Sequence, residues 1–438
     1  MTFSRLSTYF SRIEKISSRI EITKLLAELF SEISSGEIDK VLYLLQGRVC
    51  PLYVKMDFGL GEKLVLTAGS DSVGMSKEEF SKLVKKYGDL GTAIEHAKEL
   101  NSQKKYNELT ITEVFSKLTS ITSENGMGSQ ERKLQIVSDL LGSVDPLSAK
   151  YIIRVPVNML RLGFSDMTIL DGFSWMLTGG KSLRKVIEKA YHVLPDIGLI
   201  GKLIKEKGIE GLSYIKPKLF VPILMMKAER LSSGEEIISK LGEGIVESKF
   251  DGFRLQAHIK KLKNSTEVRL FSRGLDDVTH MYPDIVEALS NEIDVGDAIV
   301  EGEAIGYNSK TGEFLPFQET VQRKRKYNIE EKIKEIPLKF ILFELLYLNG
   351  VSFLNEPLTK RRESLTKITD DKFSNIILSP SQTIKTPVEI EEALFPEQAV
   401  GPALACWEEA VTPAEPVLEP VLEPVESQEW SDQSPRPA

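Results

Sequence analysis

The chain has 438 residues, too many for one ordinary hydrophobic core, so two or three domains are expected. Its two cysteines, Cys50 and Cys406, supply neither a disulfide framework nor a zinc site, and no apolar run approaches the roughly 20 residues of a membrane span. The net charge of −8 hides an acidic end: twelve acidic residues and one basic residue from Pro387 onward leave +3 on residues 1–386, which suits a polyanionic partner. The N-terminus lacks a signal-peptide core, which predicts a cytoplasmic protein, or a nuclear one in a host with a nucleus.

The first half of the chain is predicted to be helical. Residues 21–33 and 148–163 place apolar side chains at spacings of three and four, as a half-buried helix requires. Ser129, followed by Arg132 and Lys133, begins another helical stretch. The glycine-rich entry to this stretch exposes backbone N–H groups that could bind a phosphate.

From about Gly211 the pattern changes to short runs rich in β-branched and aromatic residues, bounded by turn residues and typical of strands. These runs lie at 244–261, 265–274, 298–308 and 338–350. An amphipathic helix is predicted over 282–293. A helical domain followed by an α+β domain is the simplest interpretation of this order.

The end of the chain has a third kind of composition. Nine of the twenty prolines lie from Pro387 onward, and the run "PVLEPVLEPV" repeats itself. Such a segment buries too little apolar surface to offset its ordering entropy, so disorder is expected from about Phe395. The predicted organisation is therefore multidomain: an all-α domain (1–210), an α+β domain (211–394) and a disordered Pro/Glu-rich tail (395–438).

The stretch "ESKFDGFR" carries the strongest chemical signal. Alternation along a strand would place Glu247, Lys249 and Asp251 on one face, and Gly252 permits a turn or a close approach before Arg254. A lysine becomes a nucleophile only when cationic neighbours, a metal or desolvation lower its pKa. The alternative for the motif alone is a surface strand with paired charges.

The residues around this stretch resemble the covalent nucleotidyltransferases, which include DNA ligases, RNA ligases and mRNA-capping enzymes. "ESKFDGFR" is similar to their lysine motif, and "FSRGLDDVT", "IVEGEAIGYN", "FILFELLYLNGVSF" and "EPLTKRRESL" follow in the family's order. The helical half, most visibly "YLLQGRVCPLY" and "KYIIRVPVNMLRLGFSDMTILDGFSW", resembles the DNA-binding domain of replicative ATP-dependent DNA ligases of archaeal and eukaryotic type. The resemblance covers about residues 1–390 and implies an all-α DNA-binding domain before an antiparallel-sheet, ATP-grasp-like nucleotidyltransferase domain.

The resemblance implies a covalent mechanism. Lys249 would attack the α-phosphate of ATP, release pyrophosphate and form lysyl-AMP. Glu247 would accept a hydrogen bond from the adenine amino group, Arg254 would hold the ribose or phosphate region, and Arg273 would contact phosphate.

Two further residues complete the nucleotide site that the resemblance implies. Glu303 would bind ribose and help to place Mg²⁺, and Phe343 would stack on adenine. On their own, Glu301 and Glu303 are equally typical of a solvated strand edge, and Phe343 is typical of a packed core. The four histidines show no metal-ligand spacing.

The implied activity is the sealing of nicks in DNA replication, repair and recombination. The partner is nicked double-stranded DNA, bound through phosphates and duplex shape because a nick has no defined sequence. The helical domain and the basic run 322–326 are the predicted contacts, although such runs are often only solvated faces. A sliding clamp is a candidate protein partner, and the chain is expected to be a monomer.

Two departures from the family modify these expectations. Glu344 stands where aspartate is usual, and no lysine follows Lys385, so the family's last phosphate-binding motifs and OB-fold domain are missing from the sequence. A truncated ligase, which adenylylates weakly or not at all and does not seal nicks, is therefore expected. The alternatives are a catalytically incomplete DNA-binding remnant, and an RNA ligase or capping-type nucleotidyltransferase.

Overall fold

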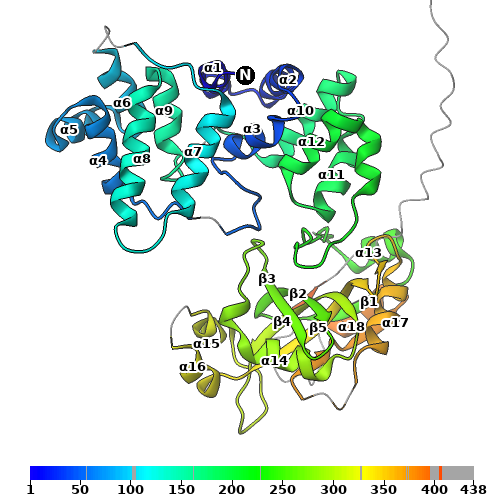
Figure 1. The fold of residues 1–438 in the computed structure, drawn as a ribbon. Helices are drawn as coiled ribbons and strands as arrows, with labels where there is room; N and C mark the ends of the chain where they lie inside the picture. The colour runs from blue at the N-terminus through cyan, green and yellow to red at the C-terminus, as the bar shows by residue number, and fades with distance from the viewer. Residues whose placement is uncertain are drawn as a thin grey trace, which may run out of the picture.

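The protein is represented by a computed structural model that describes residues 1–55, 57–100, 105–160, 162–226, 228–325, 328–370, 372, 374–394 and 404–406. Helices occupy the first half and strands begin at Gly244, which confirms the predicted order of an all-α part and an α+β part. Figure 1 shows the helical part above the sheet-containing part. The predicted disorder of 395–438 concerns residues outside the described ones, apart from 404–406. Within the described residues, the helices are too short or too polar to cross a membrane.

The helical part is built from short helices joined by tight turns. Its elements are α1 (Phe3–Glu14), α2 (Arg19–Glu32), α3 (Ile38–Leu45), α4 (Glu62–Val73), α5 (Lys77–Tyr87), α6 (Leu90–Glu99), α7 (Ile111–Ser123), α8 (Ser129–Ser143), α9 (Pro146–Arg154), α10 (Asp166–Thr178), α11 (Arg184–Val193), α12 (Ile197–Lys207) and the 3₁₀-helix η1 (Ile209–Tyr214). One hydrophobic core runs through the whole of it, from Phe3 to Leu212. The apolar faces predicted from the sequence are therefore buried against one another.

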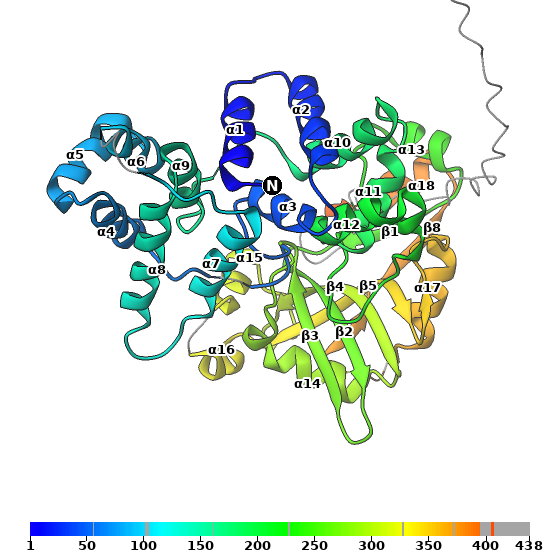
Figure 2. The ribbon, with the colours of Figure 1, turned by 45° about the horizontal axis from the view of Figure 1, so that its top comes forward.

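Close crossings between helices depend on glycine. A Cβ added at Gly172 of α10 would lie 2.9 Å from the ring of Phe30 on α2, and one at Gly201 of α12 would lie 2.3 Å from Leu42 on α3. These two helix pairs pack side by side in Figure 2. A larger side chain at either glycine would push the helices apart and open the core.

The helix predicted over 148–163 is shorter than expected. Helix α9 ends at Arg154, because Pro156 cannot donate a helical hydrogen bond and disfavours the helical conformation of the residue before it. Helix α8 begins at Ser129, as predicted. The Arg132 guanidinium donates hydrogen bonds to the Glu124 carboxylate and to the carbonyl oxygens of Asn125 and Met127, so it stabilises the turn before α8. Lys133 likewise donates to Phe58 O at 2.9 Å, so neither cation is directed at a ligand.

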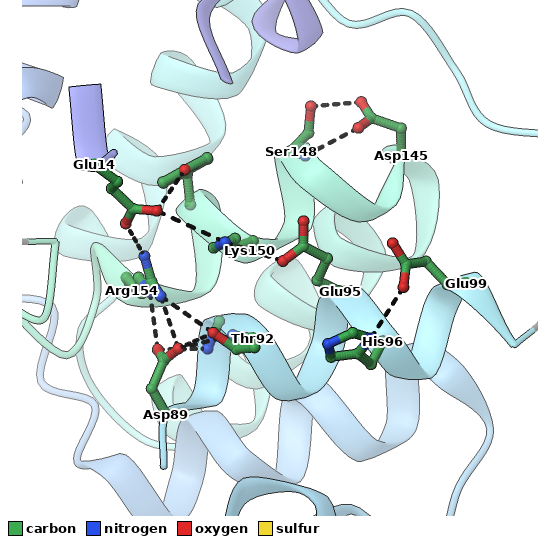
Figure 3. Close-up of polar contacts among 12 residues, drawn as sticks. Glu14, Asp89, Thr92, Glu95, His96, Glu99, Asp145, Ser148, Lys150 and Arg154 are labelled. Atoms are coloured by element: carbon green, nitrogen blue, oxygen red, sulfur yellow. Dashed lines mark hydrogen bonds and ion pairs between the residues drawn. The ribbon is translucent and has the colours of Figure 1, made fainter. Parts of the chain in front are cut away.

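Three helices of this part are joined by a network of ion pairs (Figure 3). Arg154 of α9 contacts both oxygens of Asp89, which caps α6, at 2.8 and 2.7 Å, and it contacts Glu14 of α1 at 2.5 Å. Lys150, one turn earlier, lies 3.0 Å from Glu95 and 3.7 Å from Glu14. Burial alone favours neutral Asp89, but the bonds from Arg154 and from the start of α6 outweigh it and hold its pKa well below the ordinary value.

The second part contains two sheets with helices around them. Its strands are β1 (Gly244–Lys249), β2 (Phe253–Lys261), β3 (Thr266–Ser272), β4 (Asp297–Gly306), β5 (Leu338–Leu348), β6 (Val351–Ser352), β7 (Ile376–Leu378), β8 (Ser381–Ile384) and β9 (Leu404–Cys406). Its helices are α13 (Gly234–Leu241), η2 (Thr279–Met281), α14 (Pro283–Glu292), α15 (Phe317–Thr320), η3 (Val321–Arg323), α16 (Ile329–Glu335), α17 (Leu358–Lys367) and α18 (Pro387–Leu394). The larger sheet has the order β3-β2-β4-β5-β6, with β7 parallel to β5, and the smaller has the order β8-β1-β9.

The two faces of the larger sheet have different roles. Leu255, Ala257 and Ile259 of β2 point into a core that is covered by α14, the helix predicted over 282–293. The intervening residues of β2 point to the opposite face, because side chains alternate along a strand. That opposite face carries the charged residues considered below.

We predict that Asp89→Ala lowers the free energy of unfolding of the helical part by about 2–3 kcal/mol, because it removes a helix cap and the partner of a largely buried arginine. Urea denaturation followed by circular dichroism measures this loss. The matched control is Glu99→Gln, which alters the exposed pair with His96 in the same view and should cost less than about 0.5 kcal/mol. Equal losses in the two variants would contradict a stabilising role for the network.

Candidate nucleotide-binding site

The stretch 244–261, predicted as one run of strand, forms two strands in different sheets. Strand β1 ends at Lys249 and β2 begins at Phe253. The break depends on Gly252, where an added Cβ would lie 2.3 Å from Ala304 O and 2.8 Å from Ile305. Only glycine lets the chain turn this close to β4, so Lys249 stands at the rim of one sheet facing the other.

A cavity of about 1000 Å³ that is open to solvent lies between the two sheets. The predicted site residues that line it are Glu247, Lys249, Arg254, Arg273, Glu303 and Phe343. They come from β1, β2, the residue after β3, β4 and β5, so residues almost one hundred positions apart meet in one place. The structure thus brings together the six residues to which the resemblance assigned a role in the nucleotide site.

Lys249, Arg273 and Lys324 are exposed cations of this cavity. Within the described parts of the chain, none of the three side chains forms an ion pair with a carboxylate. Their hydrogen-bond donors are therefore available for an anionic ligand. Lys249 and Lys324 can also become nucleophiles when they lose a proton, and of these two only Lys249 belongs to the stretch that resembles the family's lysine motif.

Glu303 lies deeper in the cavity than Lys249. Its carboxylate accepts the Gly252 N–H at 3.1 Å, and its Cα faces that of Arg254 across the β2–β4 pair. Burial raises the pKa of Glu303 to about 7, although the Gly252 N–H and the nearby cations oppose the rise. This carboxylate therefore changes charge near neutral pH, as groups at functional sites often do.

Arg254 connects the acidic and aromatic residues of the cavity. Its Nη2 donates to Glu301 at 2.6 Å, and its guanidinium carbon lies 5.1 Å from the centre of the Phe343 ring. Glu301 is 2% exposed and is not a solvated strand edge. Phe343 is only partly buried and lines the cavity, so part of its ring can contact a ligand.

Glu247 is held by a residue that the sequence analysis did not single out. Its carboxylate pairs with Arg362 of α17, and the same guanidinium donates to Ser379 O. The only signal for this contact is the pair of arginines in "EPLTKRRESL". The other arginine, Arg361, forms a two-bonded pair with buried Glu344 at 2.8 and 2.9 Å, so Glu344 stabilises the fold outside the cavity.

The basic run 322–326 is divided between several roles. Arg323 is fully buried and donates to Asp284 at 2.7 Å, whereas Lys324 lines the cavity. Arg325 donates to Gln322 O, and Lys326 lies outside the described residues. Arg323 is therefore not available to DNA, and contact between DNA and the exposed residues of the run stays a prediction. Lys324 is a cavity cation that the sequence alone did not identify.

The donor set of the cavity fits Mg²⁺ bound together with a polyphosphate. The described residues include no group of three or more histidine, cysteine, aspartate or glutamate side chains that could hold a metal by themselves. Mg²⁺ commonly binds through one or two carboxylates and the phosphates of its substrate. Glu303, with Asp251 close enough to influence its pKa, is the carboxylate that could serve in this way.

Comparison with known proteins follows the same division of the chain. Residues 2–174 match a family model described as "DNA ligase N terminus", and residues 225–400 match one described as "ATP dependent DNA ligase domain". "DNA ligase 2" of Thermofilum pendens is 39% identical over 410 residues, which are 91% of this chain and 67% of the relative. The chain belongs to the ATP-dependent DNA ligase family.

Other members of the ligase family are similar to this chain to the same degree. A "Probable DNA ligase" of Dictyoglomus turgidum is 42% identical over 397 residues, covering 91% of this chain and 66% of the relative. A "DNA ligase" of Sulfolobus acidocaldarius is 41% identical over 379 residues, covering 84% of this chain and 63% of the relative. The chain thus spans about two thirds of the length of these ligases.

We predict that Glu303→Gln raises the free energy of unfolding by about 1–3 kcal/mol at pH 8. Between the ordinary pKa of 4.5 and the folded value of about 7, the folded chain keeps a proton that the unfolded chain releases, so stability falls as the pH rises through this window. Glutamine keeps the acceptor for Gly252 but carries no charge. Urea denaturation at pH 4 and pH 8 measures the difference, and a benefit of equal size at both would contradict the raised pKa.

Proposed function

We propose that this chain takes AMP from ATP onto Lys249. The observation that carries the proposal is an exposed lysine amine, without an ion pair to a described residue, at the rim of a cavity that also holds Arg254, Arg273 and Glu303. Transfer of a phosphoryl-type group requires mainly positioning and charge neutralisation, and this set of side chains can provide both.

The proposed step uses the neutral amine of Lys249. Its nitrogen forms a bond to the α-phosphorus, the bond from that phosphorus to the bridging oxygen breaks, and pyrophosphate leaves. The attacking nitrogen loses one proton to solvent or to a nearby base and keeps the other in the phosphoramide. Arg273 and Lys324 would bind the phosphates, and Mg²⁺, when bound by Glu303 and the nucleotide, would supply further neutralisation.

The proposed place of the nucleoside is the part of the cavity around Phe343 and Glu247. Phe343 offers a flat apolar face to adenine, and Glu247 is oriented by Arg362 so that one carboxylate edge is fixed. The Glu247 carboxylate can accept a hydrogen bond from the adenine amino group. The match of residues 225–400 to the ATP dependent DNA ligase domain supports ATP over the GTP of the capping-type alternative.

For the whole protein, we propose the sealing of nicks in duplex DNA in replication, repair and recombination. AMP would pass from Lys249 to the 5′-phosphate of a nick, and the neighbouring 3′-hydroxyl would then displace it. The match of residues 2–174 to the N-terminal ligase model supports DNA as the partner. The sliding clamp and the monomeric state stay predictions.

We predict that incubation with ATP and Mg²⁺ adds AMP to Lys249 and none to Lys249→Ala, because Lys249 is the cavity lysine that belongs to the stretch "ESKFDGFR". The labelling should be slow and incomplete, because no lysine follows Lys385 to help neutralise the phosphates. Mass spectrometry of the intact chain and its peptides measures the adduct, and a hundredfold excess of GTP should leave it in place. Lys310→Ala, a loop lysine outside the cavity, is the control. Equal labelling of Lys249→Ala and the unsubstituted chain would contradict the proposal.

We predict that Lys249→Ala keeps its affinity for nicked duplex DNA within about twofold, because such binding is dominated by contacts to many phosphates. Gel-shift titrations at two salt concentrations measure both the affinity and its fall with salt. A DNA-binding remnant would bind in the same way while the unsubstituted chain acquires no AMP. The labelling experiment on the same preparations therefore separates the ligase proposal from this alternative.

A further inference from the structure

The sheet face that carries Arg254 continues beyond the cavity with the polar residues Gln256 and His258. Arg254, Gln256 and His258 alternate along β2 and share this face, with Arg254 at the cavity end. Gln256 is 1% exposed and His258 is 0% exposed. Residues 219–224, here called the docked segment, cover them, and Ile223 of this segment packs against the same face of the sheet.

Gln256 uses its entire hydrogen-bonding capacity in this place. Its Oε1 accepts the Ile223 N–H at 2.7 Å and faces His258 Nε2 at 2.9 Å. Its Nε2 donates to Ile223 O at 3.1 Å and to Glu301 Oε1 at 2.8 Å. An amide has two acceptor and two donor positions, so all four are occupied and its orientation is fixed.

His258 anchors the beginning of the docked segment. Its Nδ1 accepts the Phe220 N–H at 2.9 Å, so the ring proton is on Nε2 and is donated to Gln256. Phe220 has φ +66°, a left-handed conformation that a side chain other than glycine rarely adopts. Its ring also lies 4.5 Å from the guanidinium carbon of Arg269, which helps to keep this turn in place.

The network reaches the cavity through Glu301. One carboxylate oxygen accepts from Gln256 and the other accepts from Arg254, whose guanidinium lies over Phe343. A hydrogen bond between buried groups is strong and costly to leave unmade. The position of Arg254 is therefore tied to the position of Gln256.

The docked segment also contacts the helical part. The Leu224 N–H donates to the carbonyl of His192 in α11 at 2.8 Å, and Leu224 and the two methionines after it line the cavity. A continuous set of hydrogen bonds thus runs from α11, through the docked segment and Gln256, to Arg254.

We propose that Gln256 is a positioning residue that couples the seating of the docked segment to the orientation of Arg254 in the nucleotide cavity. The proposal rests on the function proposed above for that cavity. His258 fixes the beginning of the segment through the Phe220 N–H, and Gln256 binds both backbone groups of Ile223. Glu301 accepts from both Gln256 and Arg254, so a shift of the segment that moves Gln256 also moves Arg254. Nucleotide binding and the docking of the helical part are then linked, and the linkage acts in both directions.

The test combines hydrogen exchange with nucleotide affinity in the full chain. The probe is the α,β-methylene analogue of ATP, which cannot release pyrophosphate. In the unsubstituted chain, the analogue should slow the exchange of the Ile223 and Phe220 amides. In Gln256→Glu, which keeps the acceptor but places a carboxylate against Glu301, these amides should exchange roughly tenfold faster, and the affinity for the analogue should fall roughly tenfold.

A second variant separates the two ends of the network. Glu301→Gln removes the charge that holds Arg254 but leaves an acceptor for Gln256, so the affinity should fall while the exchange of Ile223 without nucleotide stays within twofold of the original rate. Gln130→Glu, at an exposed position of α8, is the control for the change of charge and should change neither quantity. Circular dichroism confirms that each variant is folded.

The outcomes are distinct. Faster exchange in Gln256→Glu together with unchanged affinity would overturn the coupling, because Gln256 would then only fasten the segment. An affinity that falls in Glu301→Gln while the analogue still slows Ile223 exchange to the same degree would also overturn it. No binding of the analogue by the unsubstituted chain would contradict the proposed function of the cavity, a result that differs from both.

Discussion

The ion pair between Arg254 and Glu301 is the contact on which the charged face of the larger sheet depends. Glu301 is 2% exposed, and Glu303 lies two residues away on the same face of β4. Without Arg254, two neighbouring carboxylates would be buried, and neither would have an ion-pair partner among the described residues. Removing one partner of a buried pair costs far more than the pair itself contributes. Arg254 therefore allows this face to carry acidic residues at all.

The three glutamates of β4 and β5 differ in how their charge is compensated. Glu301 has Arg254 and Gln256, and Glu344 has both nitrogens of an arginine fork from α17. Within the described residues, the hydrogen-bond donor to the Glu303 carboxylate is the Gly252 N–H alone, and burial raises the pKa of Glu303 to about 7. Glu303, whose ionisation destabilises the fold, is thus the carboxylate that lines the cavity. A cation bound in the cavity would stabilise its charged form.

The sequence predicted which short segments contribute residues to the site, because each motif lies within a few consecutive residues. The lysine motif, the acidic motif and the aromatic motif each lie on a strand or at a strand end. The alternation predicted to place Asp251 on one face with Glu247 and Lys249 does not reach Asp251, because β1 ends at Lys249. Contacts between distant segments could not be predicted in this way. Arg362 reaches Glu247 across 115 residues, and Gln256 and His258 looked like ordinary strand residues because their partners are backbone groups of the docked segment. The burial of Arg323 could not be predicted for the same reason, since Asp284, its ion-pair partner, lies on another helix.

The network behind the cavity is charged only at its cavity end. Gln256 is neutral, and burial together with the nearby Arg269 lowers the pKa of His258 to about 3, so the imidazole is neutral as well. Neutral donors and acceptors can fix an orientation without the desolvation cost of further buried charge. A charged histidine would lose its acceptor for the Phe220 N–H and would add a cation beside Arg269. The neutral network therefore links the position of the docked segment to that of Arg254 without adding charge near the cavity. The charge in the cavity comes from residues such as Lys249, Arg254, Arg273 and Glu303.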